Sequence, residues 1–161
     1  MGPRFAAVLL LLTVADLTAT PPSSIAGSWK LVTWTDTSEN NGMPCYPFGM
    51  APIGQFLFTA DGHFSAQVES GPDGAIPPDL PRRDFDDLRG PYLGFFGTYR
   101  FDPATEVLTL NVQGSSAPAY VMSDTERTAH FESNQLVLSG LSVRRDGHHY
   151  AWKRVLEKDT K

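Results

Sequence analysis

Cysteine is nearly missing from this sequence, because Cys45 stands alone among 161 residues. A single cysteine cannot form an internal disulfide, and it cannot supply a cysteine pair for a zinc site. A Gly-x-Ser-x-Gly nucleophile elbow and a glycine-rich phosphate loop are also absent. The sequence therefore gives no support for the serine hydrolases, nucleotide-binding domains and zinc domains that these motifs mark.

Positive charge is scarce as well. Thirteen Lys and Arg stand against 18 Asp and Glu, which leaves a net charge of −5 at pH 7. Binding to nucleic-acid phosphates requires a surplus of basic side chains on one face, so nucleic acid is not expected as a partner. The length fits one domain with a sizeable core, and the 14 Gly and 13 Pro favour strands and loops over long helices.

Only one long apolar run is present, and it lies at the N-terminus. Arg4 precedes the run Phe5–Ala15, which small and polar residues follow up to Thr20. This order is typical of a secretory signal peptide, here predicted over residues 1–20, with cleavage after Ala15 or Ala19. The run is shorter than the roughly 20 residues that span a bilayer, so no membrane span is expected after cleavage. We therefore expect export to the periplasm or the medium; an uncleaved anchor or a misassigned start codon is the alternative.

The remainder of the chain has the two-residue period of β-strands. The Asp61-Gly62 turn joins two alternating runs and predicts a hairpin, with Phe56 and Phe58 on one face of its first arm. Eight strands are predicted, the number that closes a small antiparallel barrel. Their expected ranges are 28–34, 55–59, 63–68, 95–101, 107–112, 125–132, 135–139 and 148–155. In the first strand the alternation places Trp29 and Leu31 inside and Trp34 outside.

Two long segments rich in Gly and Pro interrupt this pattern, at residues 36–53 and 69–93. Loops of this length are usually functional, so both are predicted to act as lids over the barrel. Within the second, Arg82–Arg89 is predicted to form two helical turns. The polar residues 157–161 are predicted to form a frayed tail outside the barrel domain of residues 25–156.

Several motifs resemble those of the lipocalin-like domain family of bacterial and fungal proteins. They begin with Gly27-Ser28-Trp29 and end with Trp152-Lys153-Arg154, and the likeness covers about residues 25–155. The intervening motifs are Pro52-Ile53-Gly54, Phe58-Thr59, Asp61-Gly62-His63 and Gly97-Thr98-Tyr99. The resemblance implies an eight-stranded up-and-down calycin barrel. It also implies that Trp29 plugs the barrel floor and that Arg154 packs across the Trp29 ring.

The interior that follows from the alternation mixes aromatic and polar groups. Such a lining suits a small hydrophobic or amphipathic molecule. The predicted ligand-binding residues are Trp29, Phe56, Phe58, His63, Tyr99 and Arg127. Arg127 lies where the family shows a single arginine, and a guanidinium directed into a barrel must be paired or must meet an anion. Pairing with Glu106 or Asp124 is one interpretation, and anchoring of a ligand carboxylate or enolate is the other.

Neither a metal nor a cofactor is predicted. His148 and His149 are neighbours on a strand and point to opposite faces, so they cannot reach one ion together. His63 and His130 could meet inside the barrel, but a hydrogen-bonded or surface role is the simpler interpretation. Histidines that often follow the Gly-Thr-Tyr motif in the family are replaced here by Leu110 and Asn111.

Three functions are therefore compatible with the sequence. The first is an exported protein that binds a small hydrophobic molecule inside the barrel. The second is an enzyme that isomerises or cyclises an unsaturated small molecule, with Tyr99, His63 or Arg127 as its acid–base group and its catalytic residues otherwise unknown. The third is a structural domain whose barrel is filled by its own side chains.

Overall fold

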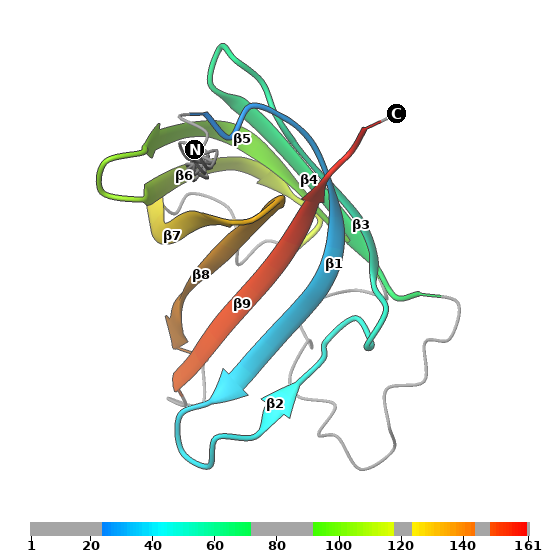
Figure 1. Ribbon diagram of the computed structural model, residues 1–161. Helices are drawn as coiled ribbons and strands as arrows, with labels where there is room; N and C mark the ends of the chain where they lie inside the picture. The colour runs from blue at the N-terminus through cyan, green and yellow to red at the C-terminus, as the bar shows by residue number, and fades with distance from the viewer. Residues whose placement is uncertain (1–23, 72–91, 118–123, 144–148, 161) are drawn as a thin grey trace, which may run out of the picture.

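A computed structural model gives the structure of this chain, and it describes residues 24–71, 92–117, 124–143 and 149–160 (Figure 1). In these residues every regular element is a β-strand. None of the described residues belongs to a helix long and apolar enough to cross a membrane. The predicted leader and the predicted turns at Arg82–Arg89 lie outside the described residues.

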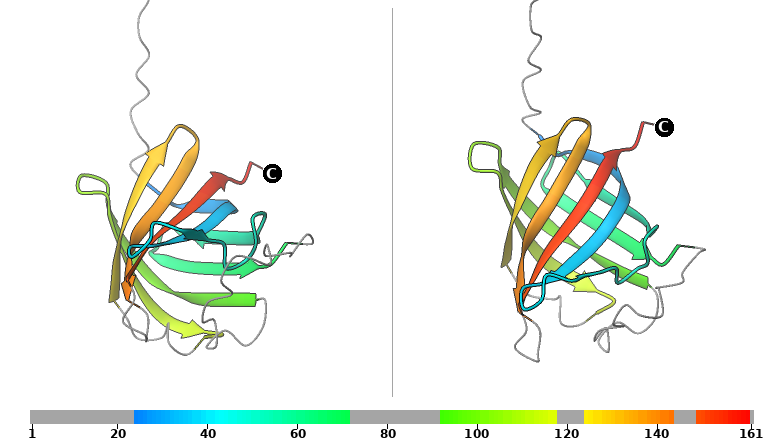
Figure 2. Two further views of the ribbon diagram at one scale, coloured as in Figure 1. Left: turned by 90° about the horizontal axis from the view of Figure 1, so that it is seen from below. Right: turned by 60° about the horizontal axis from the view of Figure 1, so that its bottom comes forward.

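The strands form one antiparallel sheet that closes on itself. Each strand from β3 onward pairs with its neighbour in sequence, and β1 pairs with both β3 and β9 (Figure 2). The strands are β1 Gly27–Ser38, β2 Pro44–Cys45, β3 Ile53–Phe58, β4 His63–Glu69, β5 Tyr92–Asp102, β6 Val107–Ser115, β7 Asp124–Glu132, β8 Gln135–Val143 and β9 His149–Lys158. Leaving aside the two-residue β2, which pairs only with β1, the result is the predicted eight-stranded up-and-down barrel.

The β3–β4 hairpin forms where the sequence predicts it. Phe64, Ala66 and Val68 are buried, whereas His63, Gln67 and Glu69 are exposed, so one face of β4 points into the barrel. Phe56 pairs with Ala66, and Phe58 pairs with Phe64. The turn is closed by backbone hydrogen bonds from Thr59 to His63 and from Gly62 to Thr59.

A β-bulge in β1 changes which residues face the interior. Leu31 pairs with Leu156 and Thr33 pairs with Val155, so Val32 is an extra residue on β1. An extra residue reverses the alternation beyond it. Trp29 and Leu31 are buried before the bulge, and Trp34 and Asp36 are buried after it. The prediction that Trp34 faces outward is therefore wrong, because simple alternation does not include the bulge.

A second bulge lies between β5 and β6. Phe96 pairs with Gly114 and Gly97 pairs with Val112, so the two backbones approach closely at this point. A Cβ atom on Gly97 would lie 1.9 Å from the backbone oxygen of Asn111. No side chain fits there, and only glycine permits this approach.

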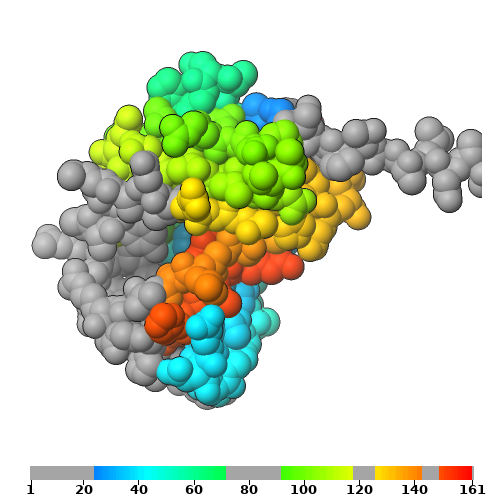
Figure 3. All heavy atoms as spheres, turned by 90° about the vertical axis from the view of Figure 1, so that its left-hand side faces the viewer, coloured from blue at the N-terminus to red at the C-terminus, as the bar shows by residue number. Residues whose placement is uncertain are grey.

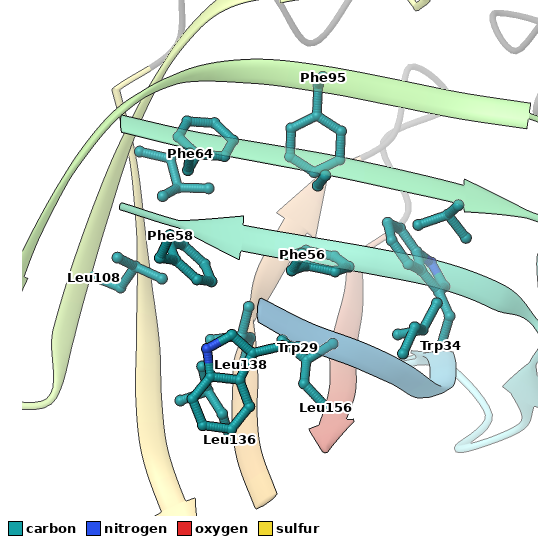
Figure 4. Packing of buried hydrophobic residues seen from close by; sticks show 14 of the residues in the cluster. Trp29, Trp34, Phe56, Phe58, Phe64, Phe95, Leu108, Leu136, Leu138 and Leu156 are labelled. Carbon is teal, nitrogen blue, oxygen red and sulfur yellow. The ribbon is translucent and has the colours of Figure 1, made fainter. Parts of the chain in front are cut away.

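One region of the interior is filled with aromatic and aliphatic side chains, and we call it the packed end. Figure 4 shows how rings from β1, β3, β4 and β5 meet leucines from β6, β8 and β9. Phe58 stacks near Phe64, and Trp29 lies beside Phe131 with ring centroids 6.0 Å apart. The packed end comprises Ile25, Trp29, Phe56, Phe58, Phe64, Phe95, Tyr99, Leu108, Phe131, Leu136, Leu138 and Leu156.

The chain folds back at both termini of the barrel to cover Trp29. The indole Nε1 of Trp29 donates a hydrogen bond of 2.8 Å to the carbonyl of Ile25, and Ile25 is itself buried. Lys158 Nζ lies 4.5 Å from the Trp29 ring centroid and donates to the carbonyl of Ala26. The last strand extends to Lys158, two residues beyond residue 156, the predicted end of the barrel domain.

Candidate functional site

The interior also contains a charged zone, which we define as Trp34, Asp36, Arg127, Trp152 and Arg154. These residues come from β1, β7 and β9, and β8 lies between the last two. Asp36 and Arg154 are the buried charged residues of the described chain, at 6% and 7% exposure. Figure 3 views the side of the molecule where the yellow, orange and red of β7, β8 and β9 follow one another, with the cyan of β1 nearby.

Arg154 forms the centre of the charged zone. Its Nη1 lies 2.7 Å from Asp36 Oδ1 and donates hydrogen bonds to the carbonyls of Thr35 and Lys153. Its Cζ lies 3.7 Å from the Trp34 ring centroid, which is close for a cation over an indole. A buried carboxylate and guanidinium are each stable here because each neutralises the other.

The predicted contact between Arg154 and Trp29 is corrected by this geometry. Arg154 pairs with Trp34 in the sheet, and Trp29 pairs with Lys158, four residues further along β9. The cation over Trp29 is therefore Lys158, and the cation over Trp34 is Arg154. Arg154 still supports barrel closure, but it does so through the second tryptophan of β1.

Arg127 reaches the charged zone across a glycine. It shares a face of β7 with the buried Ala129, and its Cζ lies 5.4 Å from the Trp152 ring centroid. On the intervening strand β8, a Cβ atom on Gly140 would lie 2.5 Å from Cζ2 of Trp152. The indole therefore occupies the space that a larger residue would fill. Gly140 allows Trp152 to lie across β8 toward Arg127.

Two residues of the charged zone retain surface although they face inward. Trp152 lies between the buried Tyr150 and Arg154 on β9, yet it is only half-buried. Arg127 is half-buried too, although its Nε atom is inaccessible. Tyr150 and Arg154, on either side of Trp152 on its face, are buried, and so is Ala129 beside Arg127.

Trp34 has an unsatisfied polar atom. Trp34 as a whole is 3% exposed, and Phe48 packs edge-on against its ring with the two ring centroids 5.1 Å apart. Within the described part of the chain, no acceptor lies within hydrogen-bond distance of Trp34 Nε1. A buried donor left without a partner costs about 1–3 kcal/mol. Trp29, by contrast, satisfies its indole N–H with the Ile25 carbonyl.

A family model described as a lipocalin-like domain matches residues 26–155. The chain belongs to the lipocalin-like domain family. A search of curated proteins found no match.

In this lipocalin-like barrel the predicted ligand-binding residues separate into two groups. Trp29, Phe56 and Phe58 belong to the packed end and are at most 3% exposed. Arg127 belongs to the charged zone, where it lies near Trp152. The pairing of Arg127 with Glu106 or Asp124 involves a side chain, that of Asp124, which is outside the described structure.

Tyr99 and His63 lie away from the charged zone. The Tyr99 hydroxyl donates a 2.8 Å hydrogen bond to the Thr59 carbonyl at the packed end, and burial raises the pKa of this phenol. His63 does not line the interior, because its side chain is 63% exposed and lies 3.3 Å from Asp61. Hydrogen bonds from Thr59 and then His63 lower the pKa of Asp61.

His130 also forms a contact at the surface. His130 lies 2.9 Å from Glu132, and this hydrogen bond, followed by the charge of Lys153, lowers the pKa of the Glu132 carboxyl. His130 and His63 therefore do not meet inside the barrel. No group of three or more His, Cys, Asp or Glu that could hold a metal ion occurs among the residues with described placement.

Sequence reasoning missed Trp34, Asp36 and Trp152 as interior groups of one site. The bulge hides the first two, because it reverses their orientation without changing the sequence pattern. Trp152 shares its alternation with Tyr150 and Arg154, and that signal was available. Its contact with Arg127 depends on Gly140, which a strand pattern alone does not reveal.

Proposed function

We propose that this lipocalin-like barrel binds a small hydrophobic or amphipathic molecule in its charged zone. The observation that supports it is the partial exposure of Trp152, between the buried Tyr150 and Arg154, and of Arg127, beside the buried Ala129, on the inner faces of β9 and β7. A mostly apolar lining with a few convergent polar groups is typical of small-molecule sites. The packed end would supply apolar contact, because Trp34 belongs to the same cluster of buried side chains and Trp152 packs against it.

Binding to a panel of apolar probes tests this proposal. Burial of about 300 Å² of apolar ligand surface, at about 25 cal/mol per Å², contributes about 7 kcal/mol before association costs. Those costs place the expected dissociation constant in the micromolar range or above. Fatty acids, retinoids and a fluorescent naphthalene sulfonate should quench emission from the three tryptophans, all of which lie on β1 and β9.

A matched pair of variants locates the bound probe. Ser142 lies on the inner face of β8 and is half-buried, whereas its neighbour Leu141 is 70% exposed on the outer face. Ser142→Phe should weaken probe binding at least about tenfold by filling the interior, and Leu141→Phe should leave it unchanged. Gly97 does not serve this purpose, because any side chain there clashes with Asn111. If neither wild-type protein nor Leu141→Phe binds any probe, the proposal is wrong and the barrel is filled.

We also propose that residues 1–20 direct export and are removed, since the N-terminal run has the order of a secretory signal. Intact-mass measurement on protein from a cell envelope fraction should show the loss of about 15 to 24 residues. A full-length product confined to the cytoplasm would contradict export without affecting the proposal of a binding site.

A further inference from the structure

The indole N–H of Trp34 indicates which chemical group a bound molecule presents to the barrel interior. The side chain is buried, and within the described ranges no acceptor reaches its Nε1. Trp29, on the same strand, has the Ile25 carbonyl as its acceptor, and Figure 4 shows the two indoles at separate places in the interior. Buried donors in folded proteins are nearly always paired. An oxygen acceptor on a bound molecule would complete the pairing of Trp34.

The charges beside Trp34 indicate that this acceptor is neutral. Asp36 follows Trp34 on the inner face of β1, and its Oδ1 lies 2.7 Å from Arg154 Nη1. An anion bound to Trp34 would bring a further negative charge close to the Asp36 carboxylate, and burying such a charge is costly. A neutral oxygen avoids this cost. A hydroxyl would also bring a donor of its own, whereas a carbonyl brings acceptor sites alone.

Trp34 Nε1 is enclosed, so an acceptor reaches it only when a side chain beside the ring moves. Arg154 Cζ lies 3.7 Å from the centroid of the Trp34 ring, and Phe48 packs edge-on with the ring centroids 5.1 Å apart. Arg154 is held by hydrogen bonds to the carbonyls of Thr35 and Lys153. Phe48 lies between β2 and β3 and belongs to no strand. Of the two neighbours, Phe48 is therefore the one that can give way.

We propose that the barrel binds an apolar molecule through a neutral carbonyl oxygen, which accepts a hydrogen bond from Trp34 Nε1 once Phe48 has moved from the indole. This inference rests on the proposed small-molecule function and specifies the polar group of the ligand. Trp34 belongs to the cluster of buried apolar side chains, and Trp152 packs against that cluster. These surroundings suit a ligand whose remainder is apolar.

Titration with acetophenone and ethylbenzene, followed by nuclear magnetic resonance, tests the carbonyl, because the two probes have nearly the same shape and differ in the oxygen. Trp34→Phe removes the indole N–H and keeps an aromatic ring. It should weaken acetophenone binding at least about fivefold and ethylbenzene binding less than about twofold, because only the carbonyl loses a hydrogen bond. Trp29→Phe is the matched control: it removes the N–H that Ile25 already accepts, so the ratio of the two affinities should stay unchanged. Equal weakening of both probes by Trp34→Phe would overturn the carbonyl site.

The indole N–H signals of the wild-type protein test the same contact without a variant. Acetophenone should move the Trp34 signal downfield, whereas the Trp29 signal, already bonded to the Ile25 carbonyl, should stay in place. Nuclear Overhauser contacts between the Phe48 and Trp34 rings should weaken in the same titration. A Trp34 signal that acetophenone leaves unmoved, or Phe48 contacts that persist at saturation, would overturn the proposal and leave small-molecule binding standing.

Benzoate carries the same ring with an anionic head group and tests the charge of the ligand. It should bind the wild-type protein more weakly than acetophenone at neutral pH, because its charge would be buried near Asp36. Tighter binding of benzoate would overturn the neutral head group. Failure of all three probes and of the wider panel would overturn the binding function itself.

Discussion

The two regions of the barrel interior differ in what fills them. At the packed end, rings and leucines from eight strands leave Trp29, Phe58 and Leu156 at most 3% exposed, and the one indole N–H has a backbone acceptor. In the charged zone a neighbouring indole lacks an acceptor, and two inward side chains keep accessible surface. The comparison teaches that one barrel can hold a region whose polar atoms are satisfied beside a region with a buried donor that lacks an acceptor, and the proposed binding function concerns the second.

The largest effect is expected at the packed end, from Trp29→Ala. This change removes a buried indole that contacts Phe131 and bonds to Ile25, so it should lower the free energy of unfolding by about 3–5 kcal/mol. Chemical denaturation measures it. A loss below about 1 kcal/mol would show that Trp29 is not part of a packed core.

In the charged zone, Asp36→Ala should destabilise by about 3 kcal/mol, because it leaves the Arg154 guanidinium buried without its carboxylate. The double variant with Arg154→Met removes both charges and should recover much of this loss. Urea unfolding of the two single variants and the double variant gives the result. Strict additivity would contradict a buried ion pair.

Gly140→Ala should destabilise the barrel by about 1–3 kcal/mol, because the new methyl group occupies the space of the Trp152 indole. It should also change the fluorescence of Trp152 by displacing the ring from Arg127. Thermal unfolding and emission spectra measure the two effects together. If the clash is the cause, the double variant Gly140→Ala, Trp152→Leu should lose less stability from the added methyl group than Gly140→Ala alone.

The cation over each β1 tryptophan distinguishes the two regions on a finer scale. A double-mutant cycle for Trp34 and Arg154 should give a coupling of about 0.5–2 kcal/mol, the range for a guanidinium over an indole. The corresponding cycle for Trp29 and Arg154 should give a smaller coupling, because Lys158 covers Trp29. A larger value for the second cycle would restore the pairing that the family resemblance implies.

The smallest effect concerns pH and the outer surface. The folded pKa of Glu132 lies below its ordinary value of 4.5, chiefly because His130 donates a hydrogen bond. The contribution of this carboxylate to stability is therefore present above pH 4.5 and is lost as the pH falls through the lower folded pKa. Glu132→Gln should flatten the acid limb of the stability curve slightly and leave probe binding unchanged. An unchanged acid limb would show that the pair has no energetic role.

The barrel could be predicted from the sequence because its evidence is local. The Asp61-Gly62 turn marks the hairpin, and alternation correctly assigns Phe64, Ala66 and Val68 to the interior. The same rule fails at Trp34, because an extra residue in a strand leaves no mark on an alternating pattern. Alternation does account for the exposed position of His63, which shares the outer face of β4 with Gln67 and Glu69.

The partners of Arg154 and Arg127 are harder to predict, for a different reason. Each depends on the register between strands far apart in the sequence: Arg154 is paired with Trp34, and Trp152 reaches Arg127 only across Gly140. Strand register is fixed by the whole set of buried contacts. A family motif therefore identifies the strands more readily than it identifies which residues of two strands are paired. A shift of four residues along β9 is enough to exchange Lys158 for Arg154 over Trp29.

The extra residue at Val32 has a consequence for what β1 supplies to the interior. Deleting this one residue would restore unbroken alternation and still leave the side chains of Trp34 and Asp36 inside, because Thr33 would take the single outward position between Leu31 and Trp34. Straightening the strand with Val32 kept in place would instead turn both side chains to the solvent, so the bulge itself holds Trp34 and Asp36 inside the barrel.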